Sequence, residues 1–476
     1  MASKKWIIGL ITILALFLIV TGCATPTATP QQEIEPQEQE AEPQQQETET
    51  PQQETEGEGP VVIQYWSNGW FPSSISGRKA LVDKFNSEYE GRIQVEYVQG
   101  DWGQGETYVQ SGVAAGGGIA CIVEWWYGGA VDWYRKGWTL DLTPYMTPER
   151  RALMEEAQWE ARTNPDDGAI VMNGTVLEEP LLMLMYNPAH LEAAGISPAT
   201  VDNPWSWSEL FENAKLLTLD ANGNHLGEEG FDKDNVVQWG YIHRIDAEKV
   251  WQDGMLFAQG RMGEAIVREE NGEWGWFLDD KGAEVYEMFL SPVREGIAPP
   301  EAIGLGGDTL EQMFVDGLAS IILRPAFAIP ILHDNFPNFQ FSAMPVPIDQ
   351  GDTVYYQAGG EGMVLTKNCE HPEQAAEFMF WIMEPENIST YAYGNGMLPA
   401  NKQALDLEPF TSDPNWDIIR SYLGMAEIFT TPFNPNYVEF RDTVLGPTLV
   451  EVASGNLTFE EANTVIEEQA KLILNR

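Results

Sequence analysis

From residue 60 onward, short apolar runs alternate with segments in which apolar residues recur every three or four positions. The runs 61–66, 93–98 and 119–124 have the length and composition of strands. A helical pattern separates the first two runs, and a second helix is predicted at about 105–115, before the third run. Strand–helix–strand alternation of this kind favours a largely parallel sheet with helices on both faces. We therefore predict an α/β fold.

Helices in the second half of the chain carry start signals. Ser206 with Glu209, and Thr458 with Glu461, have the spacing of a capping box. Pro372 stands where the first turn of a helix favours proline, directly before a segment rich in Glu and Ala. These signals predict helices that begin near 206, 372 and 458.

The N-terminus has the pattern of a secretory signal. Two lysines precede an apolar run at 6–20, which is too short to span a bilayer as a stable helix. The small residues before Cys23 resemble the lipobox of bacterial lipoproteins, and this resemblance implies cleavage after residue 22 with diacylglycerol on the Cys23 sulfur. The alternative is an N-terminal membrane anchor with an incidental cysteine. Because two or more acyl chains anchor a protein stably, we expect a protein exported to the outer face of the bacterial cytoplasmic membrane and tethered there.

Residues 23–59 consist almost entirely of Gln, Glu, Pro, Thr and Ala. Such a segment cannot bury enough apolar surface to offset the entropy lost on ordering, so we predict a disordered, extended linker. The composition changes abruptly at residue 60. Residues 60–476 are therefore the folded part, long enough for two or three domains.

Charge narrows the range of partners. The chain carries 26 Lys and Arg against 73 Asp and Glu, a net charge of −47. This charge repels nucleic acid and anionic ligands at long range, so neither is expected as the main partner. It favours a neutral or cationic solute only weakly, because an acidic surface is also a common adaptation for solubility.

No cofactor or metal is predicted. Beyond Cys23, the chain has Cys121 and Cys369, which lie beside apolar runs and are expected to be two buried thiols, with one disulfide as the alternative. The segment that starts at Asp220 is similar to the start of a calcium loop, but Phe231 occupies the place of the closing glutamate. Calcium there stays an open alternative.

Three loops that follow the predicted strands combine tryptophan with a carboxylate or an amide. In an open parallel sheet these loops meet at the carboxyl ends of the strands, where ligands bind. A sugar needs a flat apolar face for its C–H surface and polar groups for its hydroxyls. A single loop tryptophan is more often packing, but three such loops at one edge favour a site. The candidate residues in them are Trp66, Asn68, Trp70, Trp102, Glu124, Trp125 and Trp126.

Seven segments carry the motifs of one family in that family's order. They are 137–144 (GWTLDLTP), 184–188 with 194–196 (LMYNP, AGI), 204–210 (PWSWSEL), 314–319 (FVDGLA), 359–365 (GGEGMVL), 372–376 (PEQAA) and 396–400 (GMLPA). By these segments the chain resembles the extracellular solute-binding proteins of ABC importers, in the sugar-binding group similar to maltose-binding protein. It departs from the pattern at Ala120 and Cys121, where many members have Pro-Asp, and at 324–327, where many have Gly-x-Trp.

The resemblance implies a two-lobed fold of the periplasmic-binding-protein type, each lobe a mainly parallel sheet flanked by helices. We place the first lobe at 60–178 and 352–383 and the second at 184–348 and 388–476. Crossover strands near 179–184 and 349–357 would form the hinge, and the lobes would close around a ligand in the cleft between them.

Further candidates for binding come from the predicted second lobe, the crossover and the returning strand. They are Trp251, Gln252, Arg324, Phe327, Glu179, Tyr355, Gln357 and Gly360. By contrast, Trp138, Trp207, Trp381 and Trp416 fall on helical or core patterns and are predicted to be packing residues.

The resulting hypothesis is a non-enzymatic, monomeric lipoprotein that captures a neutral carbohydrate, an oligosaccharide, and delivers it to membrane permease subunits. One alternative keeps the importer role for a polyol, a peptide or a polyamine. Another is a tethered carbohydrate-active enzyme, which would need two carboxylates about 5–10 Å apart at one sugar. A third is an adhesion lipoprotein that binds carbohydrate polymers.

Overall fold

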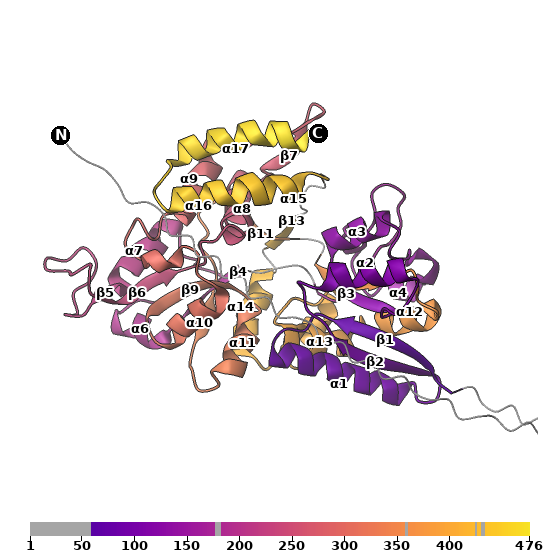
Figure 1. Cartoon of the computed structure of the whole chain (residues 1–476). Helices are drawn as coiled ribbons and strands as arrows, with labels where there is room; N and C mark the ends of the chain where they lie inside the picture. Colours follow the sequence, from indigo (N-terminus) through magenta and orange to yellow (C-terminus); the bar gives the residue numbers. More distant parts are fainter. Residues whose placement is uncertain (1–58, 177–181, 358–359, 424–425, 430–433) are drawn as a thin grey trace, which may run out of the picture. The chain divides into compact units, whose positions relative to one another are not determined.

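The computed structural model describes residues 59–176, 182–357, 360–423, 426–429 and 434–476 (Figure 1). The chain divides into two units, Met1–Gly57 and Glu58–Arg476, and all described residues lie in the second. Cys23, the predicted signal peptide and Glu179 lie outside the described residues, as does the predicted linker up to residue 58. Within the described ranges, every helix is too short or too polar to cross a bilayer.

The first sheet contains four strands. Three of them come from the N-terminal part of the chain, coloured indigo to purple in Figure 1, and the fourth comes from much later in the sequence. Their order across the sheet is β12 (Glu361–Leu365), β3 (Ile122–Trp126), β1 (Val61–Ser67) and β2 (Ile93–Gln99). Strand β1 is parallel to both β2 and β3, whereas β12 returns antiparallel to β3 and places Glu361 opposite Trp126. The predicted parallel arrangement is confirmed here.

Two helices of this region also have the predicted places: α1 (Pro72–Glu88) and α2 (Gly105–Ala115). The third strand, however, starts later than predicted. Its ladder with β1 begins at Ile122, and the N–H of Ala120 donates to the Tyr108 hydroxyl (2.8 Å) rather than to a neighbouring strand. The apolar run 119–124 therefore included a short segment that packs against α2 before the strand begins.

The N-terminus of α1 is satisfied from a distant part of the chain. Pro72 occupies its first turn, and Asp334 accepts hydrogen bonds from the Ser73 N–H (2.8 Å) and hydroxyl (2.5 Å). A carboxylate at this end of a helix also interacts favourably with the helix dipole. The apolar face of α1, which includes Leu81 and Phe85, packs into the core under β1 and β2.

The second sheet is mixed rather than mainly parallel. Its strand order is β10 (Ser342–Met344), β4 (Leu182–Tyr186), β9 (Ala319–Pro325), β6 (Val236–Ile242) and β5 (Leu219–Asp220). Only β6 and β9 are parallel, and the other three pairings are antiparallel. Every residue of β9 is buried. A strand buried on both faces has the same apolar pattern in either direction, so strand direction could not be predicted here from the residues.

Two smaller pairs complete the strands. Strand β11 (Val354–Gln357) lies parallel to β13 (Ala426–Phe429), and β7 (Val267–Glu270) forms a hairpin with β8 (Glu273–Trp276). The predicted lobe boundaries remain a prediction. They assign β11 to the first lobe, whereas its partner β13 lies in a segment assigned to the second.

The remaining helices surround these sheets. They are α3 (Tyr127–Arg135), α4 (Pro148–Arg151), α5 (Glu156–Glu160), α6 (Pro188–Ala193), α7 (Trp207–Leu217), α8 (Lys249–Met262), α9 (Asp280–Phe289), α10 (Gly307–Val315), α11 (Ala328–Asn335), α12 (Pro372–Trp381), α13 (Pro385–Asn395), α14 (Pro414–Leu423), α15 (Tyr437–Phe440), α16 (Gly446–Ala453) and α17 (Phe459–Leu474). Short 3-10 turns lie at Thr143–Tyr145, Pro300–Ala302 and Lys402–Asp406, and a π-helical turn lies at Arg441–Leu445. Both predicted capping boxes are present, at the starts of α7 and α17.

Cys121 and Cys369 form a disulfide, so the expectation of two free thiols is wrong. The antiparallel pairing of β12 with β3 brings the residue before β3 close to the turn after β12, and the two Cα atoms are 4.5 Å apart. The N–H of Thr366 donates to the Cys121 carbonyl (2.9 Å), which fixes this end of the strand pair. The sequence placed both cysteines beside strands but did not show which strands would pair.

Replacing both cysteines with serine should lower the free energy of unfolding by about 2–4 kcal/mol. The bridge joins residues 248 positions apart, and its loss frees a long loop in the unfolded chain. Scanning calorimetry of wild type and double variant, each with and without reductant, measures the effect. Reductant should lower the melting temperature of the wild type but not that of the double variant. A wild-type melting temperature that reductant leaves unchanged would contradict the assignment of the disulfide.

Candidate functional site

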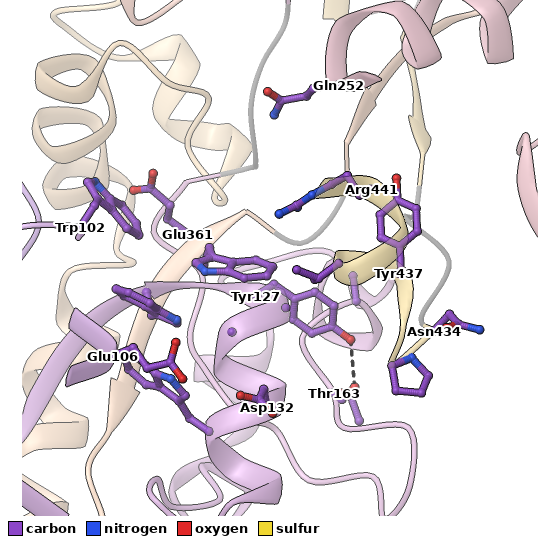
Figure 2. Close-up of a pocket in the computed structure, with 18 of the residues that line it drawn as sticks. Trp102, Glu106, Tyr127, Asp132, Thr163, Gln252, Glu361, Asn434, Tyr437 and Arg441 are labelled. Atoms are coloured by element: carbon purple, nitrogen blue, oxygen red, sulfur yellow. Dashed lines mark hydrogen bonds between the residues drawn. The ribbon is translucent and has the colours of Figure 1, made fainter. Parts of the chain in front are cut away.

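A cleft of about 2200 Å³ lies beside the loops that follow β1, β2 and β3 (Figure 2). Its other walls come from α8, from the segment around α15 and from residues 143–170. Aromatic side chains form much of its lining, namely Trp70, Trp102, Trp125, Trp126, Tyr127, Trp133, Trp251, Phe327 and Tyr437.

Trp125 and Trp126 end β3 and form the aromatic floor of the cleft. Trp125 is stacked on Trp133 of α3, with ring centroids 4.4 Å apart, and lies 5.5 Å from Trp102. Glycines make room for both indoles. A Cβ added to Gly129 would lie 2.1 Å from Nε1 of Trp125, and one added to Gly128 would lie 2.1 Å from the ring of Trp126. Gly128 and Gly129 must therefore stay glycine if both rings are to keep their places.

Two of the lining indoles are unusually exposed for their size. Trp70 is 48 % exposed and Trp126 is 38 % exposed. Trp70 contacts Phe71 and Phe327 edge-on, with centroid distances of 4.9 and 5.4 Å. Large exposed aromatic surfaces that line one cleft are typical of a binding site rather than of packing.

The opposite wall carries amphipathic and polar groups. Trp251 and Gln252 lie in the first turn of α8, and the Lys249 ammonium donates to the Gln252 side-chain carbonyl. The guanidinium of Arg441 lies 4.8 Å from the centre of the Trp251 ring. Figure 2 shows Gln252, Arg441 and Tyr437 on this wall and Tyr127 on the other, where its hydroxyl donates to the Thr163 carbonyl (3.3 Å).

Charges in the cleft are nearly balanced, unlike those of the whole chain. Six carboxylates and five cationic side chains line it. Ion pairs join Arg441 to Asp442 (2.7 Å) and Arg135 to Asp166 (2.7 Å). Arg244 pairs with Asp246 at 2.8 Å. Because these cations are matched by carboxylates, the cleft presents hydrogen-bonding groups without a strong net charge.

Seven of the residues predicted from the sequence line this cleft together: Trp70, Trp102, Trp125, Trp126, Trp251, Gln252 and Phe327. Their role in binding stays a prediction. The structure places the other candidates whose side chains it describes behind the cleft wall or outside the cleft lining.

Glu124 is buried beneath the aromatic floor, 1 % exposed, and is not among the lining residues. Its carboxylate accepts hydrogen bonds from Arg78 Nε (3.0 Å), the Tyr391 hydroxyl (2.6 Å) and the Tyr65 hydroxyl. Burial acts to raise the pKa of Glu124, but Arg78 and the two tyrosine hydroxyls outweigh it and hold that pKa below its ordinary value. Glu124 is therefore an ionised group that holds neighbouring segments together.

Asn68 and Trp66 are likewise buried. The Asn68 amide donates to the backbone carbonyl of Glu124 (2.8 Å), which ties the loop after β1 to the end of β3. The ring of Trp66 is stacked on Tyr108 at 5.2 Å and covers Gly100. Both side chains shape the cleft wall from behind.

Arg324 is 4 % exposed and forms an ion pair with Glu311 (2.6 Å). Burial raises the pKa of Glu311, and the guanidinium opposes that rise. The guanidinium carbon of Arg324 also lies 5.3 Å from the centre of the Phe327 ring. Arg324 thus supports a lining aromatic residue rather than facing the cleft itself.

Two of the returning-strand candidates, Tyr355 and Gly360, are not among the residues that line the main cleft. Tyr355 lines a separate small pocket beside Trp207 and Phe257. Gln357 ends β11, and Gly360 is buried, with its carbonyl accepting from the Tyr127 N–H (3.1 Å). Gly360 therefore acts through its backbone, at the start of α3.

Several lining residues were missed from the sequence. Tyr127 continues the run Trp125–Trp126 and could have been included on that ground, and Glu361 begins β12 within the glycine-rich segment 359–362. Tyr437 and Arg441 lie in a polar C-terminal segment with no motif. Only the folded chain brings these two residues to the cleft.

The loop at Asp220 is closed by hydrogen bonds. The Asp220 carboxylate accepts from the backbone N–H groups of Asn222 (2.8 Å), Asn224 (2.9 Å) and Asp232 (2.8 Å). Among the described residues, no three His, Cys, Asp or Glu side chains are placed to share a metal ion. These contacts account for the Asp-Ala-Asn-Gly pattern as a turn.

The chain matches the family model described as bacterial extracellular solute-binding protein over residues 69–388. Among curated proteins, it is 25 % identical over 409 residues to an uncharacterized lipoprotein in the oleD 5′ region of Streptomyces antibioticus, covering 85 % of each chain.

Solved structures with the same fold include an ABC substrate-binding protein from Listeria monocytogenes in complex with cycloalternan. It is 18 % identical, with a TM-score of 0.69, covering 87 % of this chain and 99 % of that one. A cyclic alpha-maltosyl-1,6-maltose binding protein from Arthrobacter globiformis is also 18 % identical, with a TM-score of 0.68 and the same coverage. At this identity the likeness establishes the two-lobed α/β fold.

Proposed function

Because the chain belongs to the family of bacterial extracellular solute-binding proteins, we propose that it is the substrate-binding lipoprotein of an ABC importer for a neutral oligosaccharide. The observation that carries this proposal is a cleft lined by exposed indoles and by arginines that are each paired with a carboxylate. Indole faces match the C–H surfaces of sugar rings, and paired charges supply hydrogen bonds without requiring an ionic ligand.

The size of the cleft supports an oligosaccharide. Pockets for drug-sized ligands measure about 300–1,000 Å³, and this cleft of about 2200 Å³ exceeds them. The Listeria monocytogenes and Arthrobacter globiformis proteins of the same fold were solved with, or named for, cyclic oligosaccharides.

Lining residues from opposite walls give the ligand a way to favour closure. A ligand stabilises a closed arrangement only to the extent that it contacts both sides. We propose that the sugar stacks on Trp126 and Trp70 and receives hydrogen bonds from Gln252 and Arg441 across the cleft. Closure would then present the loaded protein to the permease.

We further propose lipid attachment at Cys23 and a monomer tethered to the outer face of the cytoplasmic membrane. The family is extracellular, and the Streptomyces antibioticus relative is named a lipoprotein. Binding without cleavage is part of the same proposal.

A thermal-shift screen across mono- and oligosaccharides, polyols, peptides and polyamines tests the solute class. A sugar present at 100 times its dissociation constant should stabilise the folded protein by about 2.7 kcal/mol. Stabilisation by a polyamine or a peptide, with no response to any sugar, would contradict the proposal. Release of shorter products from the stabilising sugar would instead indicate an enzyme.

A further inference from the structure

We propose that Tyr391 of α13 is a positioning residue: through the Glu124 carboxylate, its hydroxyl holds the aromatic floor of the cleft in place. Tyr391 is buried and does not line the cleft, so it would act on a ligand only through the residues that do. The predicted effect on ligand affinity therefore rests on the proposed function.

Glu124 joins the two loops that carry the exposed indoles. It directly precedes Trp125 and Trp126 in β3. Its carboxylate accepts hydrogen bonds from the Ser67 hydroxyl (3.0 Å) and the Asn68 N–H (2.8 Å), at the start of the loop that leads to Trp70. A shift of this carboxylate would therefore move both parts of the aromatic surface.

Trp125 is held by ring packing and by its place in β3 rather than by a polar contact of its side chain. Among the described residues, its buried Nε1 has no hydrogen-bond partner, and its ring is held by stacking on Trp133 and by the space above Gly105 and Gly129. Its backbone is paired with Gly362 of β12, and Glu124, the residue before it, ties the same end of β3 to the loop after β1. A displaced Glu124 would therefore shift the strand end that carries the indole.

Tyr391 reaches this carboxylate from a segment 267 residues away in the chain. Its hydroxyl donates to Glu124 (2.6 Å) and accepts from Arg78 Nη2 (3.0 Å), and the Arg78 guanidinium lies 4.4 Å from the centre of its ring. Asn395, at the end of α13, also accepts from Arg78 (3.2 Å). Helix α13 is therefore coupled to the floor of the cleft through one shared carboxylate.

Removing the Tyr391 hydroxyl perturbs this coupling without unbalancing charge. Tyr391→Phe keeps the ring beneath Arg78 and leaves the Arg78–Glu124 ion pair in place, but it deletes both hydrogen bonds of the hydroxyl, the short, charge-assisted one to Glu124 and the one from Arg78 Nη2. The expected consequence is a displaced or more mobile carboxylate in a protein that still folds.

Tyr393→Phe is the matched control. Tyr393 lies on the same helix, and its hydroxyl donates to a different carboxylate, that of Asp413 (3.2 Å). The sugar found in the thermal-shift screen should bind Tyr391→Phe about tenfold more weakly in calorimetric titration, a change of about 1.4 kcal/mol. Tyr393→Phe should bind it like the wild type.

A second readout needs no ligand. With 5-fluorotryptophan incorporated and the resonances of Trp125 and Trp126 assigned by single Trp→Phe variants, fluorine NMR should show both shifted or broadened in Tyr391→Phe. Both should be unchanged in Tyr393→Phe. Unchanged resonances in Tyr391→Phe, or equal changes in the two variants, would overturn the inference. A wild type that binds no sugar would refute the proposed function, and the NMR comparison would still decide the positioning role.

Discussion

Replacing Trp126 with alanine is expected to remove most of the stabilisation that a bound sugar provides, while the free protein keeps nearly its full stability. Trp126 lines the cleft and is 38 % exposed, so its truncation uncovers little of the core. An aromatic anchor at the centre of a binding surface is worth about 2 kcal/mol or more, which corresponds to about 30-fold in affinity. Thermal shift with the stabilising sugar, followed by calorimetric titration, measures both quantities.

The control for Trp126→Ala is a tryptophan with the opposite environment. Trp416 is fully buried and packs edge-on against Phe410, with ring centroids 4.5 Å apart. Trp416→Ala should cost about 3–5 kcal/mol of stability through the cavity it leaves, and the sugar should raise the melting temperature as much as in the wild type. Equal ligand-induced shifts in Trp126→Ala, Trp416→Ala and wild type would place the ligand elsewhere.

The elements that the sequence predicted best are those whose burial follows a simple period. Strands β1 and β2 and helix α2 lie within a residue of their predicted bounds, and α1 lies between the two strands as predicted, because each has an apolar face packed in the core. The loops after these strands met at one edge, as their parallel pairing requires. That is why the four lining tryptophans of these loops, Trp70, Trp102, Trp125 and Trp126, could be named from the sequence.

The sequence could not show whether a residue at the end of a strand faces the cleft or lies behind its wall. Glu124 was predicted as a ligand contact because it adjoins Trp125 and Trp126, yet its partners Arg78 and Tyr391 hold it beneath them. Neither partner carries a local signal, since α1 and α13 approach Glu124 only in the folded chain. The disulfide and the place of Arg441 in the cleft lining could not be predicted for the same reason, since both depend on contacts between distant parts of the chain.

Arg78→Met should be among the most destabilising single substitutions in the first sheet region. Arg78 is 2 % exposed, and its guanidinium is the cation that faces the buried Glu124 carboxylate. Removing one partner of a buried pair leaves an uncompensated charge, which typically costs about 3–5 kcal/mol. Thermal and denaturant unfolding of the purified variant measure the loss.

The double variant Arg78→Met/Glu124→Gln separates charge from packing. If the uncompensated carboxylate causes the loss, neutralising it should recover part of the stability, and the four proteins form a double-mutant cycle with a large coupling energy. Losses that simply add would mean that Arg78 acts through its packing alone.

The effect of Arg78→Met should also depend on pH. In the wild type the folded-state pKa of Glu124 is lowered, so its contribution to stability is present above the ordinary carboxyl pKa of about 4.3 and is lost as pH falls through the lowered value. Without Arg78, burial acts on the carboxylate with less opposition and its pKa rises. As pH falls, Glu124 is therefore protonated at a higher pH in the variant than in the wild type, which removes the uncompensated buried charge. The difference in unfolding free energy between the two proteins should narrow from about pH 7 to about pH 4. Unfolding curves across this range that keep a constant gap would show that Arg78 is not needed to hold Glu124 ionised.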